Sequence, residues 1–121
     1  MRRFFARFVN LFRGRAAGDH VTLDGGGTLV VPSAGTGEVF AVIHPRAVAL
    51  HRHPPEGTPR NVWHGSIVGL DAEGPRVRVR VTGRIPIVAE ITPAAVEELH
   101  LSPGTEVWVS VKATEVAVYP T

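Results

Sequence analysis

The segment Val107–Val118, with the sequence VWVSVKATEVAV, does most to decide the fold class of the chain. Its alternate valines, from Val107 to Val111, repeat with the period of two that is typical of a strand with one buried face. We therefore expect a strand over Glu106–Thr114 and another over Val116–Tyr119. The residues expected on the outer face of the first strand are Ser110, Lys112 and Thr114.

Lys112 is the only lysine in the chain, which otherwise uses arginine for its permanently charged basic side chains. A compact ammonium group suits a small, round anion better than a planar guanidinium does. Thr58 and Arg60 lie just before the strand that is expected to start at Val62. If this stretch meets the one around Lys112 in space, Arg60 and Lys112 together supply two cations, and the neighbouring hydroxyls supply donors. Such a set suits a tetrahedral dianion. The alternative interpretation is that both cations are ordinary solvated surface charges.

The composition is that of a globular protein with one ordinary domain or two very small ones. The chain has 121 residues, of which 44% are hydrophobic and 20% charged, and it contains no cysteine. Disulfides and thiolate sites are therefore excluded. Residues 1–15 hold five arginines and no acid, whereas residues 16–121 hold eight basic and eleven acidic residues. Because the basicity lies in the N-terminal segment alone, it is weak support for nucleic-acid binding.

Residues 1–18 are predicted to form a basic amphipathic N-terminal helix. Apolar residues recur at helical spacing over Phe4–Phe12, arginines surround them, and Gly14 and Gly18 end the pattern. The segment contains no secretory signal, because arginines interrupt its apolar residues. Such a helix could lie on a membrane surface, dock on a partner or on the rest of the chain, or be the end of a larger domain.

Residues 19–57 are expected to form short strands and a linker. Asp24–Gly27 is typical of a hairpin connection, and Pro32–Gly37 of a turn-rich loop. His51 and His53, in the proline-containing linker, could ligate a metal, but two ligands without a third favour a solvated linker. The expected strands are Asp19–Leu23, Thr28–Val31, Glu38–Ile43 and Ala47–Leu50.

Residues 58–121 are expected to form a small closed barrel of the OB type. Arg76–Val81 alternates arginine with valine, so its arginines should form a solvated sheet face or an anion- or RNA-facing strip. Thr92 and Pro93 should begin a short helix. Five strands with one helix before the fourth are typical of this fold. The predicted class is mainly β, with OB-like small barrels, one short helix and the N-terminal amphipathic helix. The other expected strands are Val62–Leu70 and Ile85–Ile91.

No catalytic arrangement is found in the sequence. It contains no nucleophile elbow and no metalloprotease helix motif, and its carboxylates are scattered. His64 and His100 stand alone and are expected to be ordinary surface or half-buried residues. The chain is therefore predicted not to be an enzyme.

Thr58–Tyr119 resembles the Mop, or TOBE, domain of molybdate-binding proteins and molybdate importer ATPases. Phe40–Leu50 is similar to the segment that leads into the TOBE region of many ABC importer ATPases, and Phe5–Gly14 resembles the stretch just after their ATPase core. The whole chain thus resembles the C-terminal third of such an ATPase, but it lacks the Walker A, Walker B and ABC signature motifs. The matching landmarks are Thr58–Asn61, Gly65, Ala89–Thr92, the Glu98–Gly104 turn and Val111–Thr114.

The resemblance implies a site for molybdate or tungstate between subunits, with no metal and no cofactor. Thr114 and Thr58 stand where the family commonly has serine, so the added methyl groups alter the pocket. Thr92 matches a hydroxyl that a neighbouring subunit contributes. The implied partners are further copies of the chain through the barrel, and the membrane subunits or ATPase core of an ABC importer. The implied location is cytoplasmic, at the inner face of the cell membrane. The implied oxyanion ligands are Thr58, Arg60, Thr92, Lys112 and Thr114.

Two alternatives to an oxyanion-binding accessory domain remain open at this level. The domain could be a ligand-free structural module that dimerises an importer ATPase. It could also bind nucleic acid through the Arg76–Val81 face, which is disfavoured because the barrel offers few aromatic platforms. If the domain binds an anion, replacing Lys112 by alanine should abolish that binding with the fold intact, whereas in a purely structural module it should have no functional effect. Strongly salt-dependent binding of oligonucleotides would indicate the nucleic-acid alternative.

Overall fold

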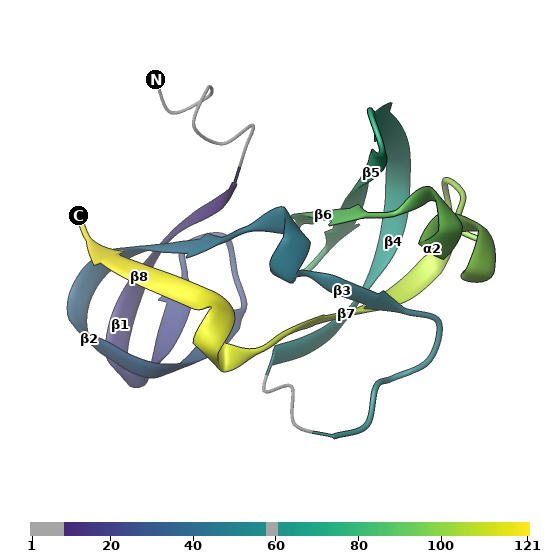
Figure 1. Ribbon diagram of the computed structural model, residues 1–121. Helices are drawn as coiled ribbons and strands as arrows, with labels where there is room; N and C mark the ends of the chain where they lie inside the picture. The colour runs from purple at the N-terminus through teal and green to yellow at the C-terminus, as the bar shows by residue number, and fades with distance from the viewer. Residues whose placement is uncertain (1–8, 58–60) are drawn as a thin grey trace.

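The computed structural model describes residues 9–57 and 61–121, which form two curled antiparallel sheets and one short α-helix (Figure 1). The first sheet has the strand order β1-β2-β8, and the second has the order β3-β7-β4-β5-β6. The elements are β1 (Asn10–Leu23), β2 (Thr28–Ile43), the 3-10 turn η1 (Pro45–Ala47), β3 (Ala49–His51), β4 (Asn61–Glu73), β5 (Arg76–Gly83), β6 (Ile87–Ile91), α2 (Pro93–Glu98), β7 (Glu106–Val111), the 3-10 turn η2 (Ala113–Glu115) and β8 (Val116–Pro120).

The two halves of the chain exchange strands. After β7 the chain leaves the second sheet, and β8 pairs with β2 of the first sheet. In return, β3 from the first half of the chain pairs with β7. In Figure 1, the yellow β8 accordingly lies with the purple and blue hairpin, away from β4 and β5. Each sheet therefore contains strands from both sides of the predicted boundary at residue 57. The division into segments 1–18, 19–57 and 58–121 stays a prediction.

The N-terminal helix prediction is wrong from Asn10 onward. β1 begins at Asn10 and pairs in register with β2, from Asn10 opposite Ile43 to Gly18 opposite Gly35. The helical spacing of the aromatic residues misled the prediction, because long-range pairing with β2 overrides a local pattern. Phe12 instead packs against the core from a strand. The rest of the predicted helix, residues 1–8, lies outside the described residues.

The predicted hairpin at Asp24–Gly27 is confirmed, but the predicted loop at Pro32–Gly37 is wrong. β2 runs through this segment as one strand, and residues 35–37 pair with β1. The register shifts between Gly18 and His20, so residues 31–34 of β2 have no partner in β1. Gly35 and Gly37 adopt φ values of 78° and 94°, which non-glycine residues rarely reach. These glycines bend the strand without ending it, so their turn-like composition did not mark a loop.

The strongly alternating segments form the strands predicted for them. The β5 valines at 77, 79 and 81 are buried, as are those of β7 at 107, 109 and 111. β7 nevertheless ends at Val111, earlier than predicted, because Lys112 leads into η2. The short helix is also confirmed, with the Thr92 Oγ1 atom accepting the Ala95 N–H as an N-cap.

The register of the strands discloses an internal repeat that sequence patterns alone had not indicated. Residues 38–51 and 106–119 correspond one to one. Phe40 pairs with Tyr119 across β2 and β8, and their counterparts Trp108 and His51 pair across β7 and β3. The two 3-10 turns η1 and η2 occupy the same place in this correspondence. The chain is therefore built from two interlocked copies of one motif, related by an approximate two-fold axis.

Each copy begins with an asparagine that reaches into the other copy. Asn61, which is buried, accepts the Val30 N–H at 2.7 Å and donates to the Val30 carbonyl at 3.0 Å. Asn10 makes the same two bonds with Val88, at 2.8 and 2.9 Å. We call these pairs of bonds the asparagine clamps. Because each clamp joins backbone of one copy to a side chain of the other, the two copies form one packed unit.

Candidate functional site

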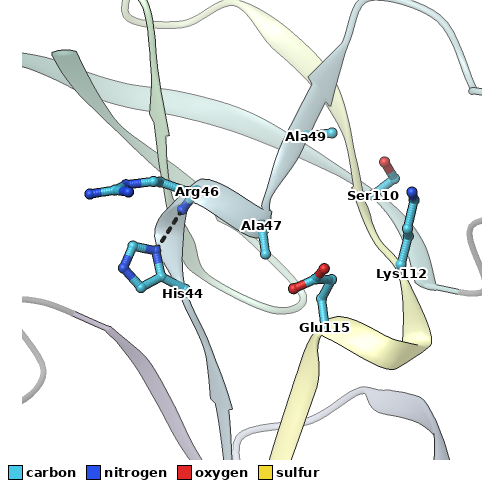
Figure 2. A pocket seen from close by; sticks show the side chains of 7 residues that line it. All are labelled: His44, Arg46, Ala47, Ala49, Ser110, Lys112 and Glu115. Atoms are coloured by element: carbon cyan, nitrogen blue, oxygen red, sulfur yellow. Dashed lines mark hydrogen bonds between the residues drawn. The ribbon is translucent and has the colours of Figure 1, made fainter. Parts of the chain in front are cut away.

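A groove of about 480 Å³ lies between the two 3-10 turns, where the two copies of the motif meet. Because its volume far exceeds the roughly 30 Å³ share of one water, it has room for a small polyatomic ion. Figure 2 shows His44 and Arg46 on one side of the groove and Ser110 and Lys112 on the other. The lining residues are His44, Arg46, Ala47, Ala49, Ser110, Lys112 and Glu115.

Lys112 is held at the point where β7 ends and η2 begins. Its backbone is extended, with φ −65° and ψ 141°, and its side chain makes no capping bond to η2. Within residues 9–57 and 61–121, no carboxylate lies at ion-pair distance from its ammonium group. The side chain is exposed and extends toward the Ser110 side of the groove (Figure 2). It therefore offers an uncommitted positive charge.

The opposite side of the groove carries basic side chains that are already engaged in hydrogen bonds. The Nδ1 atom of His44 accepts the backbone N–H of Arg46 at 3.1 Å, which closes the first turn of η1. The Arg46 Nε atom donates to Glu90 at 3.2 Å. Figure 2 shows the Arg46 guanidinium directed away from Lys112 and Ser110. This side of the groove is consequently more nearly neutral than the Lys112 side.

Ser110 was expected on an exposed strand face, but it is 5% exposed. The prediction failed because β3 pairs along β7 and places Ala49 opposite Ser110. The Ser110 Oγ atom lies 2.8 Å from His51 Nε2, so the hydroxyl and imidazole are hydrogen-bonded. Burial lowers the pKa of His51 from its ordinary value of 6.5. A neutral imidazole therefore supports the Ser110 hydroxyl beside the groove.

The lowered pKa of His51 predicts a loss of stability in acid. In the window between the folded-state pKa and 6.5, the unfolded chain binds more protons than the folded one. The free energy of unfolding should therefore fall as pH decreases through this window, and the contribution should be fully present above 6.5. Urea unfolding of the wild type and of His51→Asn between about pH 5 and about pH 8 measures it. If the free energy of unfolding had the same pH dependence in the wild type and in His51→Asn, the prediction would be contradicted. His53→Asn, in the exposed linker, is the control and should keep the pH dependence of the wild type.

The two sequence stretches predicted to meet converge on one end of the second sheet. Asn61, the residue after Arg60, pairs with Val111, the residue before Lys112. Thr58 and Arg60 themselves lie outside the described residues.

The remaining predicted ligands do not line this groove in the part of the chain that the structure describes. Thr114 is exposed within η2. Thr92 is exposed at the start of α2, where its oxygen is engaged as an N-cap while its hydroxyl proton stays available to donate. Sequence reasoning missed His44 and Glu115 as groove residues. Their positions follow from the internal repeat, which only the strand pairing discloses.

The arginine row on β5 is largely matched by carboxylates. Glu90 of β6, whose side chain is 13% exposed, lies within 3.6 Å of both Arg76 and Arg78. Arg80 pairs with Asp71 of β4 at 3.1 Å. A nucleic-acid interface needs positive charge directed at phosphates, and these ion pairs direct it along the sheet instead. The arrangement favours a structural, solvated sheet face.

Two further properties bear on the class of protein. No helix among the described residues is long and apolar enough to cross a membrane. The same residues contain no group of three or more His, Asp or Glu side chains placed to hold a metal ion.

The curled sheets, the short helix and the sequence of the second half together define a TOBE domain. Residues 57–118 match the TOBE domain family, and the chain belongs to it. The relatives are proteins of molybdate and tungstate uptake, and the matching part is their C-terminal region and not their ATPase core.

Two relatives and one solved structure illustrate this placement. The molybdenum import ATP-binding protein ModC of Mycobacterium tuberculosis is 45% identical over 87 residues, covering 69% of this chain. The molybdate/tungstate import ATP-binding protein WtpC of Pyrococcus abyssi is 31% identical over 116 residues, covering 95% of this chain. The chain spans only 24% and 33% of the length of these two proteins. The cytoplasmic molybdate-binding protein ModG, with molybdate bound, has the same fold, with a TM-score of 0.77 at 23% identity over 93% of this chain and 96% of ModG.

Proposed function

We propose that this chain binds a tetrahedral oxyanion, molybdate or tungstate, as a regulatory or accessory domain of an ABC importer system. The observation that carries the proposal is the uncommitted ammonium group of Lys112, placed in a groove beside a buried serine hydroxyl. The relatives that carry the same domain are molybdate and tungstate import proteins.

The chemistry of the groove suits such an ion. A fully deprotonated tetrahedral dianion offers acceptor oxygens and no donors, so it needs cations and N–H or O–H groups. Lys112 supplies the cation, and charge-assisted bonds are roughly twice as strong as neutral ones. Glu115 also lines the groove, and Figure 2 shows its carboxylate directed toward Ala47. Because like charges repel, the anion should bind at the Lys112 side of the groove, away from this carboxylate.

The site is completed by residues beyond this groove. Arg60 follows Thr58 in the segment that leads into β4, and its strand neighbour Asn61 is paired next to Lys112. Thr114 in η2 belongs to the same ligand set. Thr92 serves from a neighbouring copy of the chain, which links anion binding to oligomerisation. This linkage would let the oxyanion concentration act on an importer ATPase on the cytoplasmic side of the membrane.

Calorimetric titration of sodium molybdate into the full chain, with sulfate as competitor, tests the proposal. The wild type is expected to bind saturably, and sulfate is expected to compete poorly. Lys112→Ala should weaken binding by about tenfold to hundredfold, because one charge-assisted bond is lost. The fold should be retained, because Lys112 is exposed.

Arg15→Ala is the matched control, since it removes one exposed positive charge from β1, where Arg15 faces Glu38 at 3.6 Å. Its affinity for molybdate should equal that of the wild type. Absence of heat and of thermal stabilisation in the wild type would contradict oxyanion binding. That result would favour a ligand-free domain that holds importer subunits together.

A further inference from the structure

We infer that the two copies of the motif are functionally unequal, so that only the Lys112 end of the groove binds an oxyanion and each chain takes up no more than one. This inference rests on the proposed function and specifies the stoichiometry and placement of that same site. It follows from the internal repeat, the partners of each groove residue and the residue types at corresponding positions.

The approximate two-fold axis makes the two ends of the groove counterparts of each other. Lys112 and His44 each precede a 3-10 turn, with nearly the same backbone angles: φ −65° and ψ 141° for Lys112, and φ −66° and ψ 136° for His44. Glu115 and Ala47 are counterparts in the two turns, and all four residues line the groove. A symmetric protein would therefore carry two equivalent anion sites, one at each end.

The residue types show that only one end has kept an anion-binding set. At the His44 end, an imidazole stands where the other copy has an ammonium group. Val42 stands where the other copy has the hydroxyl of Ser110, because each pairs with the strand of the opposite copy at the same register. An apolar side chain thus replaces a hydroxyl group at this end.

The contacts at the His44 end also differ from those at the Lys112 end. His44 uses Nδ1 as an acceptor for the Arg46 N–H, so its imidazole is committed to capping η1, whereas Lys112 makes no such bond to η2. Arg46, the nearest full cation at that end, donates to Glu90. Binding an anion there would break an ion pair with a carboxylate that is largely buried. The same ion at the Lys112 end breaks no such contact among residues 9–57 and 61–121.

Titration of molybdate into the full chain at known protein concentration measures the stoichiometry. No more than one anion per chain is expected. His44→Asn is the informative variant, because asparagine keeps a side-chain acceptor for the 3-10 turn while removing the imidazole. Its affinity should stay within about twofold of the wild type, whereas Lys112→Ala should weaken binding by about tenfold or more.

Two results would overturn the inference while leaving oxyanion binding intact. One is binding of more than one molybdate per chain. The other is an equal loss of affinity in His44→Asn and Lys112→Ala, with both variants folded by thermal melting. Absence of binding to the wild type is distinguishable from these, because it removes the proposed function itself and the inference with it.

Discussion

Replacing Asn61 by alanine is expected to destabilise the protein by about 3 kcal/mol, because it leaves two backbone groups of Val30 without their partners. Asn61 is 4% exposed, and its side-chain amide bonds both the N–H and the carbonyl of Val30. The asparagine amide thereby bonds the Val30 backbone as a neighbouring strand would, and it joins the two copies of the motif. Alanine supplies neither bond and leaves a small cavity.

The pseudo-symmetric variant Asn10→Ala should have a comparable effect, since Asn10 makes the corresponding bonds to Val88 and a further one to the Ile43 carbonyl at 3.1 Å. Urea unfolding measures both. Val62→Ala, at a 38% exposed position next to Asn61, is the control and should change stability by less than about 0.5 kcal/mol. A loss in Asn61→Ala no larger than in Val62→Ala would show that the clamp does not hold the copies together.

The second large effect is expected from Gly65→Ala in β4. A Cβ atom at this position would lie 2.6 Å from the Thr82 carbonyl oxygen and 2.6 Å from a methyl carbon of Val81. The first of these atoms is backbone, so β4 and β5 must separate locally. We expect a loss of about 2 kcal/mol, as for other overpacked sites. Gly14, the counterpart in β1, meets Thr22 and Val21 in the same way.

Gly25→Ala is the matched control for this substitution. Gly25 lies in the hairpin turn, a Cβ atom there would meet no atom within 4 Å, and its φ lies outside the left-handed region. Thermal or urea unfolding of the three proteins is sufficient. If Gly65→Ala and Gly25→Ala were equally stable, the close approach of β4 and β5 would be wrong.

The β5 and β7 strands could be predicted from the sequence because their alternation is local and strong. Burial on one face needs only a period of two, and both strands show it. The prediction of an N-terminal helix was wrong because the structure of this segment depends on long-range pairing and not on its local pattern. The apolar spacing that includes Leu11 and Phe12 fits a helix locally, but the backbone hydrogen-bonding groups of β1 pair with β2. At Phe12 the partner is Ala41, more than twenty residues away in the sequence.

Half of the candidate site was within reach of the sequence and half was not. Lys112 drew attention as the single lysine, and its approach to the Asn61 region is supported by the pairing with Val111. His44 could not be found in this way, because its role depends on an internal repeat of low identity. The repeat becomes plain only when strand pairing aligns residues 38–51 with 106–119. Ser110 was misplaced because the neighbour that buries it, β3, comes from the other copy.

A crystal structure of the full chain with tungstate bound is the most direct test of this account, since the electron-rich tungsten atom marks its position without ambiguity. The account predicts one anion at the Lys112 end of the groove, with an oxygen within hydrogen-bond distance of the Lys112 ammonium group, and none at the His44 end. Tungstate bound only elsewhere, or at both ends of the groove, would contradict it.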